Sequence, residues 1–215
     1  MRRHYVFRSD RIKVTEKMIG IIPAKRILEI GAGDYSFDYL RKPEQTWMKV
    51  DIESPCDFIC DLNNYDLNIP LSANSMDLII CTEIMEHLLW PHILLKEICR
   101  ILVLDGGAIL SVPNIASLSY RAAWITGRLP SCAASGNLPR KLRSTAYEIE
   151  SGKTVGGHVI DFNIKRLVSL LMSEGFKLVK LKGSGIIWHR QILPYWLVPP
   201  SLASNIICLA KKVEA

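Results

Sequence analysis

The sequence lacks the cysteine patterns that stabilise small metal-binding or disulfide-linked proteins. Its six cysteines form no Cys-x-x-Cys pair, and Cys56 and Cys60 have no histidine at zinc-finger spacing. The basic N-terminus is not followed by the apolar run of roughly 7–15 residues that a secretion signal contains. Because disulfides are rare in proteins that are not secreted, we expect reduced thiols and a cytoplasmic location.

The sequence also has little that could span a membrane. One window, Gln191–Ala210, has no charged side chain, but it contains Pro194, Pro199 and Pro200. Prolines remove helical hydrogen bonds, so three of them disfavour a spanning helix. We interpret the window as an apolar loop that leads into a buried strand.

The positive charge is too unevenly distributed to indicate nucleic-acid binding by itself. The formal net charge of the 215 residues is +6. Residues 1–26 carry eight basic and two acidic side chains. Residues 27–110 carry five basic and 14 acidic side chains, and residues 111–215 carry 14 basic and five acidic ones. With 49% hydrophobic and 22% charged residues, the chain has a globular composition, and its length suits one domain over residues 1–215.

Short apolar runs alternate with segments of helical periodicity along the chain. The runs predict strands at residues 26–30, 47–51, 58–61, 76–81, 108–112, 176–181 and 206–210. Helices are predicted within residues 10–20, after the turn at 31–33, from Pro91 to before Gly106, and from the cap Asn163 to Gly175. This alternation predicts an α/β fold: a Rossmann-like, doubly wound, seven-stranded and mostly parallel sheet with helices on both faces.

A glycine turn, Glu29-Ile-Gly31-Ala-Gly33, ends the first predicted strand. Glycines there allow a ligand to approach the backbone where a Cβ would block it. Parallel sheets bind ligands at the carboxyl ends of their strands. Two acids end neighbouring strands: Asp51 can accept hydrogen bonds from ribose hydroxyls, and Asp61 lies within reach of an adenine edge. The pattern therefore predicts a nucleoside-binding site at this edge.

The surroundings of the turn disfavour a dinucleotide. Ser36 stands where the dinucleotide fingerprint has its third glycine, and no Lys or Arg lies between Arg26 and Arg41. The acidic excess of residues 27–110 would repel a diphosphate and suits a cationic cofactor. S-adenosylmethionine is a sulfonium ion with ribose and adenine but no phosphate, and it fits these features.

These segments resemble the successive motifs of class I S-adenosylmethionine-dependent methyltransferases. The segments that carry the resemblance are Arg26–Gly33, Val50-Asp51, Asp57–Leu62, Met76–Leu88 and Gly106–Asn114. Cys81-Thr-Glu-Ile-Met-Glu-His87 is similar to the strand-four motif of the small-molecule enzymes of ubiquinone and menaquinone biosynthesis. The resemblance implies a basic arm and helix (1–25), a cofactor-binding half (26–112), a lid or insertion (113–157) and a substrate-side half (158–215).

The resemblance also implies roles for residues at the strand ends. The expected cofactor-binding residues are Glu29, Gly31, Gly33, Asp51, Ile52, Asp61, Leu62, Cys81 and Thr82. Gly31 and Gly33 would approach the methionine part, Asp51 would bind the ribose, and Asp61 with Leu62 would frame the adenine. The backbone of Cys81 and Thr82 would face the methionyl amino group. The family usually has another glycine where this chain has Tyr35, which predicts a narrower pocket.

Two histidines are candidate catalytic residues. His158 lies where the lid returns to the domain, after Gly156-Gly157, and similar methyltransferases carry a Gly-His there. His87 is the second candidate for a general base; the alternative for each is a structural role, in a hinge or capping a loop. Glu83, Glu86 and His87 have the residue types of a metal site. Three such residues within five positions more often form a solvated turn, so no metal is predicted.

The expected acceptor is a small or lipid-like metabolite, methylated by in-line displacement, with oxygen as the favoured atom. The chain has no Asn/Asp-Pro-Pro-Tyr motif and no Pro-Cys motif, which disfavours methylation of exocyclic amines and of cytosine C5. The loop at residues 127–157 is basic and the loop at Ile186–Ala203 is apolar, a combination that suits an amphipathic acceptor. Peripheral membrane contact, an RNA-modifying methyltransferase and a cofactor-binding protein without turnover remain alternatives.

Overall fold

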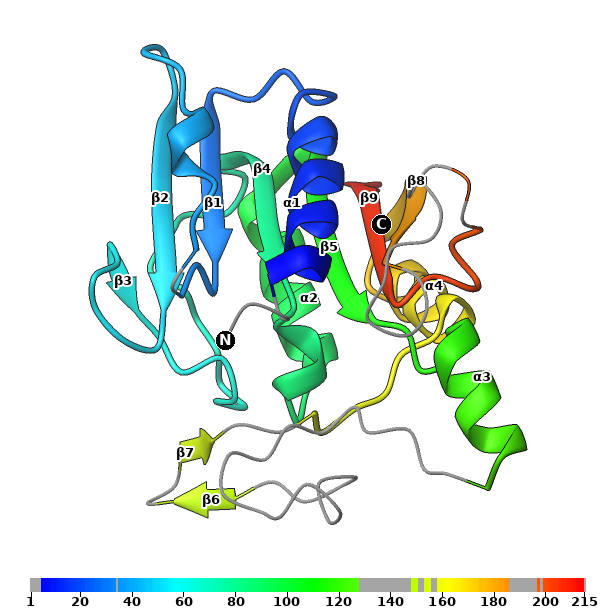
Figure 1. The fold of residues 1–215 in the computed structure, drawn as a ribbon. Coiled ribbons are helices and arrows are strands. Elements are labelled where there is room, and N and C mark those ends of the chain that lie inside the picture. The colour runs from blue at the N-terminus through cyan, green and yellow to red at the C-terminus, as the bar shows by residue number, and fades with distance from the viewer. Residues whose placement is uncertain are drawn as a thin grey trace.

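The computed structural model describes residues 5–33, 35–127, 148–150, 153–155, 158–185, 197 and 199–214. Within them lies a seven-stranded sheet in the order β3-β2-β1-β4-β5-β9-β8 (Figure 1). Its strands are β1 (Arg26–Ile30), β2 (Thr46–Asp51), β3 (Phe58–Ile59), β4 (Met76–Thr82), β5 (Leu102–Pro113), β8 (Phe176–Ser184) and β9 (Asn205–Lys212). A two-stranded sheet pairs β6 (Glu148–Glu150) with β7 (Lys153–Val155).

The sheet is mostly parallel, as the sequence predicts. The pairs from β3 through β5 are parallel, and β9 is antiparallel to both of its neighbours, β5 and β8. After β1 the chain adds β2 and β3 on one side, and then crosses to add β4 and β5 on the other. In doubly wound sheets this switch point is where ligands bind, at the carboxyl ends of β1 and β4.

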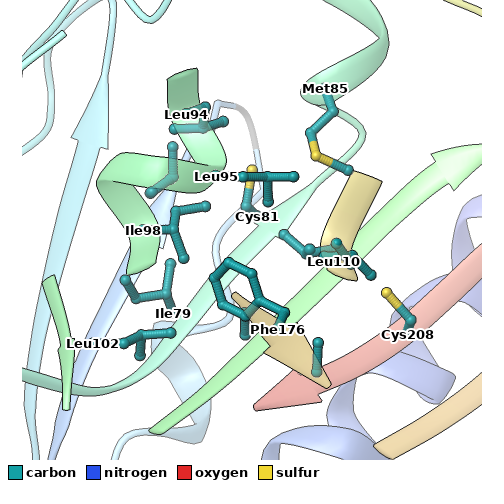
Figure 2. Packing of buried hydrophobic residues seen from close by; sticks show 14 of the residues in the cluster. Ile79, Cys81, Met85, Leu94, Leu95, Ile98, Leu102, Leu110, Phe176 and Cys208 are labelled. Carbon is teal, nitrogen blue, oxygen red and sulfur yellow. The ribbon is translucent and has the colours of Figure 1, made fainter. Parts of the chain in front are cut away.

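Helices cover both faces of the sheet (Figure 1). The α-helices in the described residues are α1 (Tyr5–Ile19), α2 (Pro91–Ile101), α3 (Leu118–Ile125) and α4 (Ile164–Ser173). On one face, Val14 and Met18 of α1 belong to a buried cluster with Ile80 of β4. On the other face, α2 and α4 pack against the alternate strand residues, and Figure 2 shows Leu95 of α2 close to Cys81 of β4. Alternation along the strands therefore gives the sheet an apolar surface on each side.

The ends of two helices follow from local sequence. Pro91 occupies the first turn of α2, where a missing backbone N–H costs no hydrogen bond. Asn163 caps α4, and its side-chain oxygen accepts a hydrogen bond of 2.8 Å from the backbone N–H of Arg166. Both features confirm the sequence-based predictions.

The helix predicted after the glycine turn is wrong. The chain there forms only a 3-10 turn, Asp38–Leu40, before it reaches Pro43. Phe37 is buried in the cluster beneath α1, so its apolar side chain serves the core of that face rather than a helix. The three residues between Phe37 and Arg41 form a single turn.

The strand β5 begins earlier than predicted, at Leu102 rather than at residue 108. The Gly106-Gly107 pair predicts the end of a helix, but both glycines lie buried within β5. A Cβ on Gly107 would approach Cγ1 of Ile22 to 2.8 Å, so glycine is needed there for the segment before β1 to pack on the strand.

Residues 128–147 of the predicted lid lie outside the described residues, together with Arg128, Arg140, Lys141 and Arg143. The apolar loop predicted as an acceptor wall lies largely outside them too, at residues 186–196 and 198. Among the helices that the structure describes, none has the length and apolar character needed to cross a membrane.

Candidate active site

The carboxyl ends of β1, β2 and β4 meet around the glycine turn. Gly31 has a φ of +70° and donates its backbone N–H to the carbonyl of Val50 at 2.8 Å. A Cβ on Gly31 would lie 2.1 Å from Cδ1 of Ile84, which follows β4. Only glycine both adopts this φ readily and leaves this space, so the turn packs directly against the segment after β4.

Asp51 at the end of β2 holds the same turn from the other side. Its Oδ2 accepts the N–H of Gly33 at 2.9 Å, and its Oδ1 accepts the N–H of Ile52 at 2.7 Å. A carboxylate has about four acceptor positions, so two remain for ribose hydroxyls. The half-buried side chain is thus fixed in place with acceptor capacity to spare.

A cavity of about 180 Å³ lies between α1 and these strand ends. Its lining includes Arg11, Gly31, Gly33, Tyr35, Thr82 and Glu83. The structure thus brings three of the predicted cofactor-binding residues, Gly31, Gly33 and Thr82, to one cavity. The volume is small, so the cavity suits part of a nucleoside-containing cofactor rather than the whole molecule.

Glu29 lies beneath the glycine turn, and only 2% of its surface is exposed. Its carboxylate accepts hydrogen bonds from the Ser36 hydroxyl (2.6 Å), the Phe37 N–H (3.0 Å) and the Trp47 indole N–H (3.0 Å). Burial raises the pKa of Glu29, and the three donors oppose that rise. These contacts shape the turn from below; that Glu29 also touches the cofactor stays a prediction.

The residues predicted to surround the adenine lie on loops after β2 and β3. Ile52 is 40% exposed, and Asp61 is exposed with its Oδ1 accepting the N–H of Asn63 at 2.9 Å. Leu62 is partly buried against the core cluster of the α2 face. The Cys81 side chain points into that same core, so only its backbone lies at the strand ends (Figure 2).

Glu83 carries a network that the sequence analysis missed. Its carboxylate forms an ion pair with Arg11 of α1 at 2.8 Å and accepts hydrogen bonds from Ser111 and Asn205, each at 2.8 Å. The network joins α1, β5 and β9 to the residue after β4. A basic residue on a helix before β1 is a visible signal for Arg11, but nothing in the sequence marks Ser111 or Asn205.

Tyr35, the departure from the family pattern, lines the cavity with part of its side chain. Its ring makes edge-on contacts with Phe37 and Tyr39, and its hydroxyl lies 2.9 Å from that of Tyr39. The Tyr39 hydroxyl in turn donates to Glu16 of α1. Tyr35 therefore belongs to an aromatic group that links the turn to α1.

The two candidate catalytic histidines meet, although 71 positions separate them in the sequence. The ring centroids of His87 and His158 are 5.0 Å apart. Burial, and next the neighbouring His87, lowers the pKa of His158 to about 4, so its imidazole is neutral at physiological pH. A neutral imidazole of such low basicity can accept a hydrogen bond from an acceptor hydroxyl, but it removes a proton poorly.

Glu86 lies beside the histidines and is 1% exposed. Its Oε1 is 3.9 Å from Nε2 of His87, and neither carboxylate oxygen has a hydrogen-bond donor in the described residues. Burial raises the pKa of Glu86 to about 8. The backbone carbonyl of Glu86 accepts the N–H groups of Val159 and Ile160, at 2.7 and 3.1 Å, which brings the segment of His158 to this loop.

Comparisons with known proteins agree with this arrangement. Residues 28–110 match the family model described as a methyltransferase domain. A search of curated proteins with the sequence finds no significant match. The segment matched by the family model includes the glycine turn, Asp51 and the loop after β4.

Solved structures share the fold at low sequence identity. A SAM-dependent methyltransferase from Archaeoglobus fulgidus has a TM-score of 0.58 and 17% identity, over 98% of this chain and 94% of that chain. The Burkholderia thailandensis 1,6-didemethyltoxoflavin-N1-methyltransferase has a TM-score of 0.54 and 16% identity, over 94% of this chain and 76% of that chain. One further match is a chain from the complex between the Haloferax volcanii Trm112 methyltransferase activator and a methyltransferase. It has a TM-score of 0.58 and 12% identity, over 94% of this chain and 89% of that chain.

Sheet order and domain match together define the fold as that of a class I methyltransferase, Rossmann-like with an antiparallel β9. The glycine turn and the spare acceptor positions of Asp51 suit an adenosine bearing a sulfonium. The chain shares its fold with S-adenosylmethionine-dependent methyltransferases, and its residues 28–110 match a methyltransferase domain.

Proposed function

We propose that this chain is an S-adenosylmethionine-dependent methyltransferase that acts on the oxygen of a small or lipid-like metabolite, as its resemblance to the ubiquinone and menaquinone branch implies. The observation that carries the proposal is the pairing of two sites at one sheet edge. The glycine turn with Asp51 would hold the cofactor, and the neutral His158 beside His87 would receive the acceptor. When bound, S-adenosylmethionine supplies an electrophilic methyl group.

The residues around the predicted cofactor site have different parts in this proposal. Asp51 binds the ribose hydroxyls, while Ile52 and Leu62 pack against the adenine and Asp61 meets its edge. Gly31, Gly33 and the backbone of Cys81 and Thr82 surround the methionine part. Arg11, whose guanidinium has five donors, is suited to the cofactor carboxylate while it keeps its ion pair with Glu83.

Substitution of Asp51 by alanine tests the cofactor site. We expect Asp51→Ala to weaken S-adenosylhomocysteine binding about 10- to 100-fold, because the charged acceptor of the ribose hydroxyls is lost. Isothermal titration calorimetry measures the change. Asp66→Ala is the matched control, since Asp66 is an exposed acid on the loop after β3. If Asp51→Ala binds as tightly as the control, the ribose assignment is wrong.

Exposed apolar side chains on α3 support a lipid-like substrate. α3 begins just after the carboxyl end of β5 (Figure 1). Its Trp124 is 57% exposed and its Ile125 is 86% exposed. The Burkholderia relative methylates nitrogen of a small heterocycle, as its name states, so the choice of oxygen rests on the resemblance.

An RNA acceptor is the second candidate, suggested by the basic C-terminal half. The described part of that half has exposed Lys177, Lys180 and Lys182 on β8, an edge strand. Lysines are common on edge strands because they prevent pairing with another chain. Their position therefore has a structural explanation, which favours the small-molecule proposal.

A methyl-labelling experiment separates the two acceptors. Cell lysate is divided into aqueous metabolites, an organic extract and total RNA, and each is incubated with the protein and methyl-tritiated S-adenosylmethionine. We expect ribonuclease-resistant label in the metabolite or organic fraction. Label confined to RNA would establish the alternative, and binding of the cofactor with no label in any fraction would indicate a protein without turnover.

A further inference from the structure

Three potential metal ligands from two distant segments converge next to the cofactor site. Glu86 and His87 belong to a 3-10 turn, Met85–His87, after β4, and His158 precedes α4. One ligand atom from each lies within 4.8 Å of the other two. Metal–nitrogen bonds of about 2.0–2.1 Å allow two donors on one ion to lie at most about 4.2 Å apart, so small ring rotations complete a site.

The buried carboxylate of Glu86 points to a cation. It is 1% exposed and both of its oxygens lack donors in the described part of the chain. An ionised carboxylate buried without a partner costs several kcal/mol, so such a group either keeps its proton or binds a cation. Nε2 of His87 lies 3.9 Å from Oε1 of Glu86, and a shared ion would satisfy both groups.

Glu83, three residues earlier, has the opposite environment. Arg11, Ser111 and Asn205 already saturate its carboxylate at 2.8 Å each. The sequence suggests Glu83, Glu86 and His87 as the metal-type cluster, but the fold turns Glu83 toward the cavity beside the glycine turn and brings His158 to Glu86. The two glutamates of the motif thus have different tasks.

We propose that Glu86, His87 and His158 bind a divalent transition-metal ion at the acceptor side of the cofactor pocket. Two imidazoles and one carboxylate are a donor set for Zn²⁺ or Fe²⁺, with a coordination position left for substrate or water. Mg²⁺ fits less well, because it prefers oxygen ligands.

Contacts with neighbouring segments fix the two segments that carry the three ligands. The Asn63 side chain accepts the N–H of Leu89 at 2.8 Å and donates to the carbonyl of His87 at 3.5 Å, which fixes the turn after β4. On the other side, Phe162 bridges to Asn114 at the end of β5. Both ligand segments are therefore tied to strand ends of the main sheet.

The role of the ion rests on the proposed function. A hydroxyl of the acceptor that coordinates the open position would lose its proton more readily, because the cation stabilises the oxyanion. The preferred acceptor is thus a phenol or enol whose oxygen can reach the ion.

Cobalt spectroscopy tests the site without any substrate. The full chain is stripped with a chelator and titrated with Co²⁺. We expect one ion per chain, visible-range d–d bands, no intense sulfur-to-cobalt charge-transfer band, and displacement by Zn²⁺. His158→Ala and Glu86→Gln should each weaken Co²⁺ binding at least tenfold, and circular dichroism reports whether the variants are folded.

Two controls make the outcome decisive. His92→Ala removes a nearby histidine outside the cluster, and Cys60→Ser removes a nearby thiol; both should bind Co²⁺ as the parent chain does. Glu86→Gln keeps the shape and removes the buried charge, so it should fold even if an alanine variant does not. Equal binding by His158→Ala and His92→Ala, or no 1:1 binding by the parent chain, would overturn the proposal.

The metal result and the methyltransferase proposal can fail separately. The Co²⁺ titration contains no S-adenosylmethionine, and the Asp51→Ala calorimetry is run with chelator present. Cofactor binding without Co²⁺ binding removes only the metal site. Co²⁺ binding without methyl transfer in any fraction keeps the site and removes its proposed role.

Discussion

Glu29→Ala should cost on the order of 3–5 kcal/mol of folding free energy. The substitution leaves the N–H of Phe37 and the indole N–H of Trp47 without their buried acceptor and opens a cavity beneath the glycine turn. Urea denaturation followed by circular dichroism measures the loss. We also expect weaker S-adenosylhomocysteine binding, because the glycine turn that lines the cavity would lose its support.

Glu29→Gln and Ser36→Ala should lose less folding free energy than Glu29→Ala. Glutamine keeps one carbonyl acceptor, so it should cost about half as much as alanine. Ser36→Ala removes one donor to the carboxylate and should cost about 1 kcal/mol. If Glu29→Ala unfolds at the same urea concentration as the parent chain, Glu29 does not support the turn.

Gly31→Ala should combine backbone strain with a steric clash. The φ of +70° costs an L-residue about 1–2 kcal/mol, and the new Cβ would lie 2.6 Å from Cγ1 of Ile84. Overpacking of this kind typically adds about 1–3 kcal/mol. Because Ile84 lines the cavity beside the glycine turn, its displacement should also reduce S-adenosylhomocysteine affinity at least tenfold.

Gly33→Ala is the matched control for that variant. Its φ is +49°, but a Cβ there would meet no atom within 4 Å. We therefore expect only the backbone strain, and a smaller loss of thermal stability than for Gly31→Ala. Equal losses in differential scanning calorimetry would show that contact with Ile84 does not matter.

Local patterns were enough to predict the part of the fold that places the cofactor. The run Arg26–Ile30 forms β1 with the predicted bounds, and the carboxyl ends of β1, β2 and β4 meet as expected for parallel strands. Pro91 and Asn163 start helices because their effects act within one turn of the backbone. Strand runs and helix caps need no knowledge of distant residues.

Features that depend on distant contacts were not predictable from these patterns. The order of strands along the chain does not reveal that β9 lies between β5 and β8. His158 meets His87 only because the segment after the predicted lid bonds to the carbonyl of Glu86. Gly107 has the sequence pattern of a helix end, but glycine is needed there because Ile22 packs closely against it.

The interior position of β9 has a consequence for biosynthesis. Until residues 205–212 have left the ribosome, β5 has an unpaired edge and Glu83 lacks the amide of Asn205. An unpaired strand edge is a template for aggregation, so a nascent chain at this stage depends on rapid completion or on a chaperone. The cofactor pocket can therefore reach its final form only after the last strand of the sheet has been translated, in one late step rather than progressively from the N-terminus.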